Sequence, residues 1–446
     1  MKTLPSGSDA IYDIVGVGFG PSNLALAVAI EEYNASLPLD RLDRRLKAGF
    51  LEAQPRFGWH RGMLIEDATM QVSFLKDLVT LRNPTSDFSF VSYLHEQGRL
   101  VDFLNQKTFF PLRVEFHAYF EWAASRVDHL VEYGAEVLAV EPVTDERGEV
   151  RWLEVTSRDP AGGGTVVRRT RNLCVATGLE PHLPPGTALS ERVWHTSQLL
   201  DRAANVPGGP GAVRRAVVLG AGQSAAEAVD YLHRTFPQAE VCSVFAKYGY
   251  TPADDSPLAN RIFDPEAVDV YHGSPQNVKR SLDDYHRSTN YSVVDMDLIE
   301  SLSATLYREK VTGRRRLRMM NVSRIREVQD GPEGLSLTVE YLPTGERQVL
   351  EADVLVHGTG YRPRDLAALL GDLSKLCERD DEDAVRVGRD HRVATAERLT
   401  AGIYLQGATE HTHGITSTLL STAAVRAGEI LDSLLARSSA AVSGVG

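Results

Sequence analysis

The sequence predicts an α/β protein with two Rossmann-like dinucleotide-binding domains and a small, mostly helical cap. An apolar strand, a glycine-rich turn and a helix with apolar periodicity follow one another at residues 12–30 and again at residues 215–227. Two further apolar strands, at residues 172–178 and 353–361, each lead into Thr-Gly. The repeated order of strand, turn and helix indicates two parallel sheets, one for each glycine turn.

Length and composition agree with more than one domain. The chain has 446 residues, of which 43% are hydrophobic and 24% charged, as is typical of a globular protein of two or three domains. Its three cysteines, Cys174, Cys242 and Cys377, lie far apart. Because no C-x-x-C pair is present, the sequence excludes a zinc ribbon and a dithiol reductase. The sparse cysteines also favour a reducing compartment.

Charge and hydropathy limit the possible partners. The chain carries 48 Lys and Arg against 60 Asp and Glu, a formal net charge of −12, which disfavours nucleic acid as a partner. No apolar stretch is long enough to span a membrane, and the N-terminal residues lack the apolar segment of a secretory signal. We therefore expect a soluble cytoplasmic protein without a membrane partner.

The first glycine turn contains Gly18 and Gly20 and precedes a helix that begins near Pro21. The two glycines stand where the turn must be tight and the backbone must approach a pyrophosphate. The helix then directs its free N–H groups and the positive end of its dipole toward the phosphates. The pattern departs from G-x-G-x-x-G at the third position, where Asn23 stands.

The next strand of this domain, at residues 47–52, ends in Glu52. In a dinucleotide-binding fold, the acidic residue that ends the second strand binds the adenosine ribose. Glu52 lies 34 residues after Gly18, so we expect an insertion in the polar stretch at residues 31–45. An exposed strand end without a ligand is the alternative interpretation of Glu52.

The second glycine turn contains Gly220 and Gly222, and Ala225 at its third position still permits close packing of helix against strand. The next strand begins at Glu240 and leads to Lys247, with no acid at its end. A carboxylate there would repel a 2′-phosphate, whereas a cation accommodates it. The sequence therefore predicts NADPH rather than NADH, unless Lys247 points into solvent.

Proline- and glycine-rich stretches at residues 183–186 and 208–211 bracket a passage between domains. The two strands that lead into Thr-Gly resemble the crossovers of flavoproteins that hold FAD in one domain and NAD(P)H in another. This resemblance implies one discontinuous FAD domain at residues 1–205 plus 350–446 and an NADPH domain at residues 206–349. Within the second domain, residues 251–312 are expected to form the substrate-binding cap.

Four separated motifs narrow the function. They are Gly-Phe-Gly-Pro-Ser-Asn at residues 18–23, the block from Phe57-Gly-Trp-His through Met70 to Pro84, Gly-Ala-Gly-Gln-Ser-Ala-Ala-Glu at residues 220–227, and His-Gly-Ile-Thr-Ser-Thr-Leu-Leu-Ser at residues 413–421. In this order they resemble the N-hydroxylating flavoprotein monooxygenases, the L-ornithine N5- and L-lysine N6-monooxygenases of siderophore and related natural-product pathways. The resemblance runs from about residue 12 to about residue 432 and is strongest to the bacterial ornithine enzymes.

The resemblance implies FAD and NADPH as cofactors and a homotetramer as the assembly. The residues that it implies for FAD are Gly18, Gly20, Pro21, Ser22, Asn23, Glu52, Trp59, His60, Gln71 and Leu420. Those that it implies for NADPH are Gly220, Gly222, Gln223, Ser224, Ala225, Glu227, Lys247 and Tyr291.

For the substrate, the resemblance implies Lys76, Asn260, Asn290 and Ser421, with Ser417 as the alternative serine. Lys76 would pair with the α-carboxylate, and Gln71, Lys76 and Asn290 are the catalytic candidates, with Gln71 near the nicotinamide. His411 and His413 lack helical ligand spacing and a third partner, so we assign them to a cofactor loop and expect no metal.

The chemistry of this family suits these residue types. NADPH reduces the flavin, O₂ adds at flavin C4a, and the distal oxygen of the hydroperoxide passes to an amine nitrogen. The transfer needs a lone pair, yet a free alkylammonium has a pKa of about 10.4, so the amine must be desolvated away from carboxylates. Neutral amide side chains beside the reacting amine and Lys76 beside the α-carboxylate meet that need. The distance between the carboxylate and the amine of the substrate then distinguishes ornithine from lysine.

We therefore expect an NADPH- and FAD-dependent monooxygenase that hydroxylates the terminal amine of L-ornithine through a C4a-hydroperoxyflavin, for siderophore or related hydroxamate or piperazate biosynthesis. Two alternatives stay open. The same chemistry could act on L-lysine or on a diamine such as putrescine or cadaverine, although a diamine would leave Lys76 unpaired. A flavoprotein without oxygenation would instead be an NADPH oxidase or a redox-sensing module, and would form no hydroxylated amine.

Overall fold

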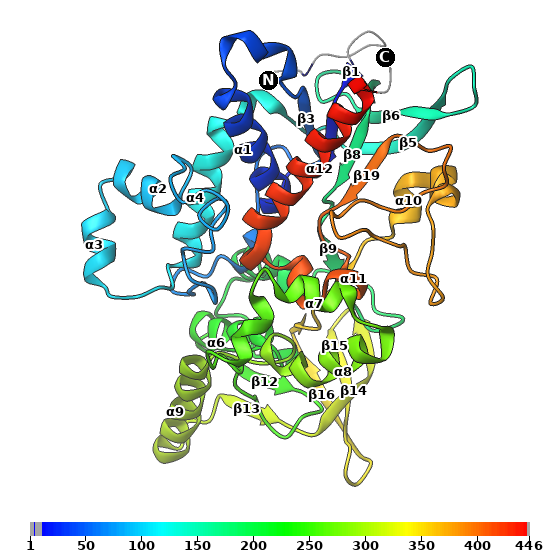
Figure 1. Cartoon of the computed structure of the whole chain (residues 1–446). Coiled ribbons are helices and arrows are strands. Elements are labelled where there is room, and N and C mark those ends of the chain that lie inside the picture. Colours follow the sequence, from blue (N-terminus) through cyan, green and yellow to red (C-terminus); the bar gives the residue numbers. More distant parts are fainter. Residues whose placement is uncertain (1–3, 5–10, 444–446) are drawn as a thin grey trace.

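The computed structural model describes residue 4 and residues 11–443 (Figure 1). Within these residues, two parallel sheets form the centres of two domains, and an antiparallel sheet packs on one face of each. The predicted α/β fold with two Rossmann-like domains is therefore confirmed.

The parallel sheet of the first domain is buried on both faces. Its strands in spatial order are β19 (Gly402–Leu405), β8 (Asn172–Val175), β2 (Ile14–Val17), β3 (Ala48–Glu52) and β4 (Val131–Tyr133). Ile14 faces a core shared with helices α1 (Pro21–Ser36) and α12 (Ala423–Ser443), whereas Val15 faces the antiparallel sheet. Burial on both sides explains why these strands are nearly continuous apolar runs in the sequence.

The antiparallel sheet of this domain contains β7 (Thr165–Thr170), β6 (Val150–Arg158) and β5 (Val137–Thr144), and the short β1 (Ile11–Tyr12) pairs parallel with β7 at its edge. An ion pair joins it to the parallel sheet: Arg168 on β7 lies 2.6 Å from Glu132 on β4, and the two side chains are 1% and 2% exposed. Glu132 also accepts the backbone N–H of Leu4 at 2.8 Å. A pair buried this deeply is stable only while both charges are present.

The connection between β3 and β4 contains helices α2 (Phe90–Glu96), α3 (Leu100–Asn105) and α4 (Arg113–Arg126). Asp77 anchors the loop before α2, because its carboxylate accepts the backbone N–H groups of Thr80 and Phe90 at 2.7 and 2.8 Å. This anchor fixes the backbone next to Lys76. The extra length between Gly18 and Glu52 lies in α1 and in an exposed 3₁₀ turn at Leu39–Arg44.

The second domain repeats the layered plan. Its parallel strands in spatial order are β10 (Val193–His195), β17 (Val354–His357), β11 (Arg215–Leu219), β12 (Glu240–Val244) and β13 (Leu317–Met320). One face packs against helices α5 (Leu199–Ala204), α6 (Gln223–Thr235) and α9 (Met296–Thr312). The other face packs against the antiparallel strands β14 (Ser323–Gly331), β15 (Gly334–Tyr341) and β16 (Glu346–Ala352).

The chain crosses between the domains twice, and the two crossings pair with each other. Strand β9 (Leu179–Pro181) follows β8 and leads to the second domain, and β18 (Tyr361–Pro363) follows β17 and leads back; they form an antiparallel pair. The expected boundaries at residues 205 and 350 therefore need correction. Because β10 and β17 pair with each other and β17 pairs with β11, the second sheet begins before residue 205 and ends after residue 350.

Residues 251–312 are mostly helical, but they do not form one unit. Helices α7 (Ala267–Gly273) and α8 (Gln276–His286) and two 3₁₀ turns precede α9. Helix α7 contacts α11 (Glu410–His413) near the C-terminus, whereas α9 packs on α6 and belongs to the second core. Only the part before α9 therefore has the position of a cap. A short helix, α10 (Leu366–Leu370), follows the return crossing.

Among the described residues, no helix combines the length and the apolar character needed to cross a bilayer.

The buried Arg168–Glu132 pair leads to a stability prediction. Glu132→Gln leaves the guanidinium buried without a countercharge, and we expect the free energy of unfolding to fall by about 3–5 kcal/mol. The double change Glu132→Leu/Arg168→Met should cost much less, because it removes both charges. Chemical denaturation measures the free energy of unfolding of the single and the double variant. Glu136→Gln is the control, because its partner Arg158 is exposed, and it should change stability by less than about 1 kcal/mol. An equal loss in Glu132→Gln and the double variant would contradict this account.

Candidate active site

The first glycine turn has the shape that a pyrophosphate needs. Gly18 has φ +82°, and a Cβ there would lie 2.4 Å from the carbonyl oxygen of Ala176. Gly20 is the N-cap of α1, no side chain caps the helix, and no atom lies within 4 Å of the position of a Cβ on Gly20. With Pro21 and Ser22 in the first turn, the free N–H groups of α1 face open space, which fits a dinucleotide phosphate.

Asn23 braces this turn from behind. Its side chain is fully buried, its Nδ2 donates to the Gly18 carbonyl at 2.7 Å, and its Oδ1 accepts from Gln406 Nε2 at 2.9 Å. Both ends of the amide are therefore used within the protein. Asn23 thus shapes the turn, and the predicted direct contact with FAD stays a prediction.

Arg426 on α12 extends the brace to the C-terminal loop. Its Nη1 donates to the Ser417 carbonyl at 2.8 Å, its Nη2 to Ser22 Oγ at 3.2 Å, and its Nε to Gln406 Oε1 at 3.4 Å. Burial lowers the pKa of this guanidinium to about 10, so it stays charged at neutral pH. Gln406 and Arg426 lie outside both glycine motifs, so the local sequence gives no sign of their role.

Glu52 lies at the edge of the same turn. Its side chain is 8% exposed, and its two oxygens accept the backbone N–H groups of Phe19 and Gln54 at 2.6 and 2.8 Å. The alternative of an exposed strand end is therefore wrong. Its role toward an adenosine ribose stays a prediction.

The second turn repeats the geometry of the first. Gly220 has φ +145°, and a Cβ there would lie 2.2 Å from the Gly358 carbonyl oxygen. A Cβ on Gly358 would lie 2.5 Å from that of Ala225, so only small residues allow α6 to pack this closely on the sheet. Gly222 is the N-cap of α6, again without a side-chain cap, and Ser224 lies in the first turn. This cradle also fits a dinucleotide phosphate.

Lys247, the predicted contact for a 2′-phosphate, is an exposed side chain beyond β12. Its Nζ donates to the Ser292 carbonyl at 2.7 Å. Ser292 itself has φ +58° and follows Tyr291, another predicted NADPH contact. The Lys247 ammonium thus supports the strained segment that carries Tyr291, and a role toward phosphate stays a prediction.

A polar network joins the two domains between the turns. Arg113 on α4 makes a two-bond ion pair with Glu227 on α6, at 2.6 and 2.9 Å. Asp295 accepts from Gln71 Nε2 at 3.1 Å and from Gln223 Nε2 at 2.9 Å. The predicted residues Gln71, Gln223 and Glu227 are therefore brought together. Arg113 and Asp295 were missed, since neither lies in a glycine turn.

The aromatic residues predicted for the flavin lie beside α4. Trp59 packs edge-on against His60 and Phe120, with ring centroids 4.9 and 5.4 Å apart. His60 has φ +47°, a left-handed conformation that few side chains adopt. Trp59 and Leu420 pack against the same hydrophobic cluster. Segments far apart in the chain thus meet at this edge of the first domain.

The residues predicted for the substrate come from the loop before α2, from the cap and from the C-terminal loop. Lys76 Nζ lies 5.9 Å from the ring centroid of Phe263, in the 3₁₀ turn that also carries Asn260. Among the described residues, Lys76 has no carboxylate partner. Asn260 Nδ2 donates to the Asp255 carbonyl at 2.7 Å. The half-buried Asn290 makes no side-chain hydrogen bond to any described residue.

The C-terminal loop contacts the cap next to these residues. The Tyr291 hydroxyl donates to Glu410, which also accepts from Thr418 Oγ1 at 3.0 Å. Ser421 is 3% exposed, and the buried Ser417 Oγ has no hydrogen-bond partner among the described residues. The contacts therefore bring the loop of both candidate serines close to Tyr291 and Asn290. They leave open which of the two serines meets a substrate.

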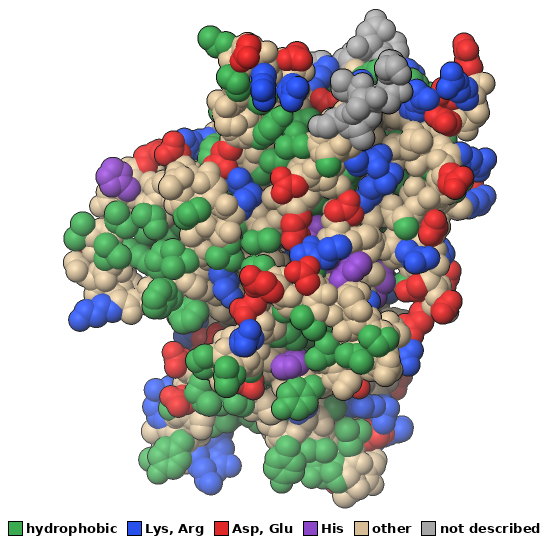
Figure 2. Space-filling model, viewed as in Figure 1, with side chains coloured by type: hydrophobic (Ala, Val, Ile, Leu, Met, Phe, Trp, Pro, Cys, Tyr) green, Lys and Arg blue, Asp and Glu red, His purple; other side chains and the backbone are tan. Residues whose placement is uncertain are grey.

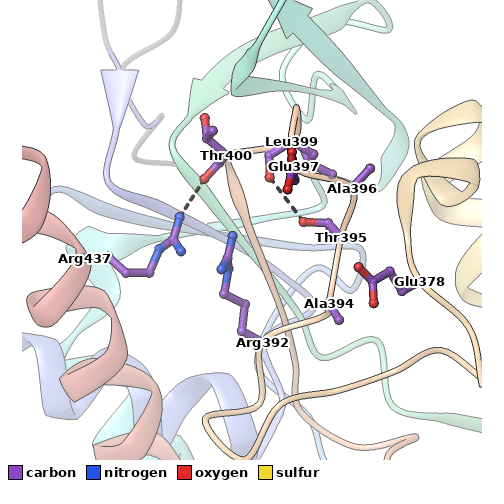
Figure 3. Close-up of a pocket in the computed structure, with 9 residues that line it drawn as sticks. All are labelled: Glu378, Arg392, Ala394, Thr395, Ala396, Glu397, Leu399, Thr400 and Arg437. Carbon is purple, nitrogen blue, oxygen red and sulfur yellow. Dashed lines mark hydrogen bonds between the residues drawn. The ribbon is translucent and has the colours of Figure 1, made fainter.

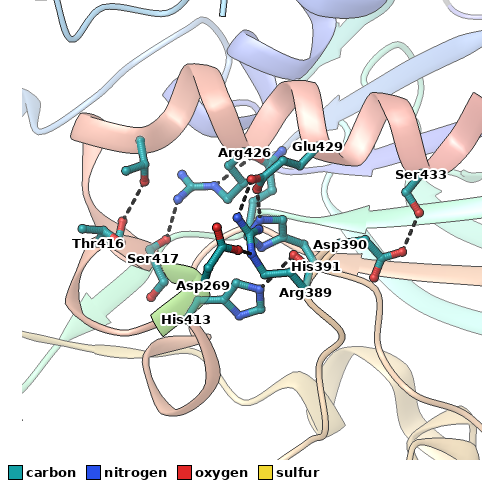
Figure 4. Close-up of polar contacts among 12 residues, drawn as sticks. Asp269, Arg389, Asp390, His391, His413, Thr416, Ser417, Arg426, Glu429 and Ser433 are labelled. Atoms are coloured by element: carbon teal, nitrogen blue, oxygen red, sulfur yellow. Dashed lines mark hydrogen bonds and ion pairs between the residues drawn. The ribbon is translucent and has the colours of Figure 1, made fainter. Parts of the chain in front are cut away.

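A charged cluster between the cap and α12 lies behind this loop (Figure 4). Arg389 pairs with Asp269 on α7 at 2.5 Å and with Glu429 on α12 at 2.7 Å. Burial alone would raise the pKa of Glu429, but hydrogen bonds from His391 and Arg389 lower it to about 2. Burial and the neighbouring imidazoles lower the pKa of His413 to about 2, and its ring stacks on His391 at 4.3 Å.

His411 and His413 therefore serve this contact region. His411 Nε2 is 2.8 Å from the Val385 carbonyl oxygen, and His413 lies within the cluster. Among the residues that the structure describes, no three His, Cys, Asp or Glu side chains are grouped to hold a metal ion.

A separate cavity lies elsewhere (Figure 3). Its volume is about 400 Å³, and it is lined by Glu378, Arg392, Ala394, Thr395, Ala396, Glu397, Leu399, Thr400 and Arg437. None of the predicted site residues lines it, so it is separate from the two turns.

Known proteins share this arrangement of two glycine turns in one chain. The sequence pattern of the family described as L-lysine 6-monooxygenase/L-ornithine 5-monooxygenase matches residues 10–363. The chain belongs to this family. The predicted resemblance is therefore confirmed, and the fold described above is the fold of a monooxygenase.

Individual members of the family are similar over nearly their whole length. The L-ornithine N(5)-monooxygenase of Burkholderia cepacia is 42% identical over 413 residues, 91% of this chain and 90% of that protein. The L-ornithine N(5)-monooxygenase of Pseudomonas aeruginosa is 39% identical over 97% of this chain and 95% of its own. The ornithine N-hydroxylase of Kutzneria sp. 744, described with reduced FAD, NADP⁺ and L-ornithine, superposes with a TM-score of 0.90 at 44% identity, over 96% of this chain and 100% of that one.

The brace behind the first turn leads to a prediction. Asn23→Leu keeps the volume but removes the side-chain donor to the Gly18 carbonyl and the oxygen that accepts from Gln406 Nε2, at about 1–3 kcal/mol each. We expect at least a tenfold weaker affinity for FAD, measured by flavin titration of the apoprotein. Asn34→Leu on the same helix is the control, because its amide bonds only to Leu46, and it should lower stability without changing FAD affinity. Equal FAD affinity of both variants would contradict the role of Asn23.

The low pKa of His413 predicts acid lability. Because its folded pKa lies below the usual 6.5, the unfolded chain binds more protons below that pH. The contribution of neutral His413 to the free energy of unfolding is therefore fully present above about pH 6.5. It is lost as the pH falls below that value, by up to about 1.4 kcal/mol per pH unit. Glu429, whose pKa is lowered from the usual 4.5, changes the free energy of unfolding only at a pH below that value. Unfolding free energies between about pH 7 and about pH 5 should show a smaller slope in His413→Asn. The slope should be unchanged in the exposed-site variant His95→Asn.

Proposed function

We propose that this chain is an FAD- and NADPH-dependent monooxygenase that hydroxylates the terminal side-chain amine of L-ornithine with O₂. The observation that carries the proposal is the Lys76 ammonium, which has no carboxylate partner among the described residues and lies beside the turn of Asn260. The relatives and the solved structure above, which are named for ornithine, support the same substrate.

The two glycine turns suit the two cofactors of the family. The first turn, with Gly18, Gly20 and Glu52, would hold FAD, and the second, with Gly220 and Gly222, would hold NADPH. Bound FAD, once reduced by NADPH, supplies the activation of oxygen. The protein contributes binding, orientation and exclusion of water around the cofactor.

The side chains around Lys76 bind the two ends of the substrate in different ways. The Lys76 ammonium attracts the α-carboxylate, and its loop is held in place by the buried Asp77 carboxylate. Asn260 and Asn290 contribute neutral amides, which bind polar groups without stabilising a positive charge on the amine. A site of this kind favours the neutral amine, whose lone pair the oxygen transfer requires.

Lysine and diamines fit this arrangement less well. Lysine has one more methylene between the carboxylate and the amine, so a rigid Lys76 loop would misplace the reacting nitrogen. Putrescine and cadaverine have no carboxylate and would leave the Lys76 charge unpaired. An NADPH oxidase without oxygenation would need neither Lys76 nor the amides.

We also propose that the protein works in the cytoplasm, as a homo-oligomer such as a tetramer, in siderophore or related hydroxamate or piperazate biosynthesis. An apolar patch on α3 and the segment after it supports self-association: Val101, Leu104, Phe109 and Phe110 are 69%, 59%, 59% and 47% exposed. Figure 2 shows hydrophobic side chains gathered over this part of the molecule. Light scattering on the purified protein tests the assembly.

The function is tested by product analysis. The purified, FAD-loaded protein is incubated with NADPH, O₂ and ornithine, lysine, putrescine or cadaverine, and hydroxylated amine is compared with NADPH consumed. We expect near-stoichiometric hydroxylation of ornithine and much less with the other amines. NADPH consumption without hydroxylated product from any amine would show an oxidase and contradict the proposal.

The role of Lys76 leads to a specific prediction. Lys76→Met keeps the apolar stem but removes the charge, and we expect the KM for ornithine to rise by about 10–100-fold. FAD content and the affinity for NADP⁺ should not change. Lys310→Met on α9, an exposed lysine, is the control and should behave as the wild type. An unchanged KM in Lys76→Met would remove the assignment of Lys76 to the substrate carboxylate.

A further inference from the structure

Asp295 is an N-cap residue that does not cap its helix. It stands before α9 with φ −58° and ψ 139°, the usual backbone conformation of an N-cap. Aspartate is favoured at this position because its carboxylate accepts N–H groups of the first helical turn. Here no such hydrogen bond is formed. The carboxylate of Asp295 is therefore used for something other than the stability of α9.

Both carboxylate oxygens accept hydrogen bonds from glutamines of other segments. Oδ1 accepts from Gln71 Nε2 at 3.1 Å, and Oδ2 accepts from Gln223 Nε2 at 2.9 Å. The Asp295 backbone N–H returns a bond to Gln223 Oε1 at 2.8 Å. Asp295 thus joins a loop of the first domain to the first residue of α6, directly after the second glycine turn.

The Asp295 carboxylate has no ion-pair partner of its own among the described residues, and the two glutamine amides donate to it directly. The charged groups that face it are Glu227, Arg113 and Asp297. The Arg113 guanidinium is already paired with Glu227, and no ion pair among the described residues includes Asp295. The two glutamine contacts are therefore the main interactions that hold the carboxylate in place.

A carboxylate also decides which way the amide of Gln71 points. It only accepts hydrogen bonds, so it requires Gln71 to turn its NH₂ group toward Asp295. The NH₂ group of Gln223 is also held by Glu227 Oε1, at 3.0 Å. For Gln71 this directs the carbonyl oxygen away from Asp295, and no described residue donates to that oxygen. An asparagine at position 295 would not impose this orientation, because its amide both donates and accepts.

We propose that Asp295 is a positioning residue for flavin reduction: it fixes the amide of Gln71 and ties it to the second glycine turn, so that the two bound dinucleotides face each other at one separation. The inference rests on the proposed function, in that it takes FAD and NADPH as the occupants of the two turns. Because the turns belong to different sheets, only contacts between the domains can set this separation. Asp295 is such a contact and lies directly beside the second turn.

Asp295→Asn and Asp295→Ser test the role. Asparagine keeps the size, and serine is a good N-cap, so α9 and the fold should be retained. We expect the rate at which NADPH bleaches the flavin band to fall at least tenfold, and the dissociation constant of NADP⁺, measured by calorimetry, to rise about tenfold. FAD content and the melting temperature should stay unchanged. Asp297→Asn, in the exposed first turn of α9, is the matched control and should match the wild type.

A double variant separates positioning from a general structural effect. If Asp295 acts through Gln71, adding Asp295→Asn to Gln71→Leu should slow flavin reduction little further. Wild-type NADP⁺ affinity and reduction rate in both Asp295 variants, or fully additive effects in the double variant, would overturn the inference. A wild-type protein that is reduced by NADPH but hydroxylates no amine would instead overturn the proposed function and leave the role of Asp295 standing.

Discussion

The two-bond ion pair between Arg113 and Glu227 is the contact on which the geometry of the whole site depends. The side chains are 11% and 8% exposed, and they join a helix of the first domain to the helix that follows the second glycine turn. Two parallel hydrogen bonds fix the angle as well as the distance between these two helices. Arg113 also donates to the Met63 carbonyl, so the loop before the flavin-side residues is fixed by the same guanidinium. The separation of the two turns is thus held by this charged contact together with the bonds of Asp295 to Gln71 and Gln223.

The sequence predicts the parts of the site that follow local rules. Gly18 and Gly220 adopt backbone conformations that only glycine accepts readily, and each lies against a carbonyl oxygen of the neighbouring strand. Such positions have to be glycine, so they are visible in the sequence. The same holds for Ala225, whose small side chain is required by Gly358, and for the apolar strands of the two parallel sheets. Lys76 was found through its family motif, because nothing in its local sequence distinguishes it from a surface lysine.

The rest depends on contacts between distant segments, which a local pattern does not contain. Asp295 looks like an ordinary helix cap in the sequence, and only the folded chain shows that its carboxylate serves Gln71 and Gln223. Asn23 looked like a ligand because of its place in the glycine motif, yet Gln406 occupies its amide. The domain boundaries were misplaced for a similar reason, since the membership of a strand in a sheet depends on its neighbours and not on the linker before it.

The brace behind the first turn also bears on biosynthesis. Gln406 and Arg426, which steady the turn at residues 18–20, follow their partners Asn23 and Ser22 by 383 and 404 residues in the chain, so the turn is made long before its support. A nascent chain therefore carries a glycine loop without its support through most of translation. We therefore expect tight flavin uptake only after the C-terminal helix has been synthesised, and weak flavin binding by polypeptides that end before Gln406.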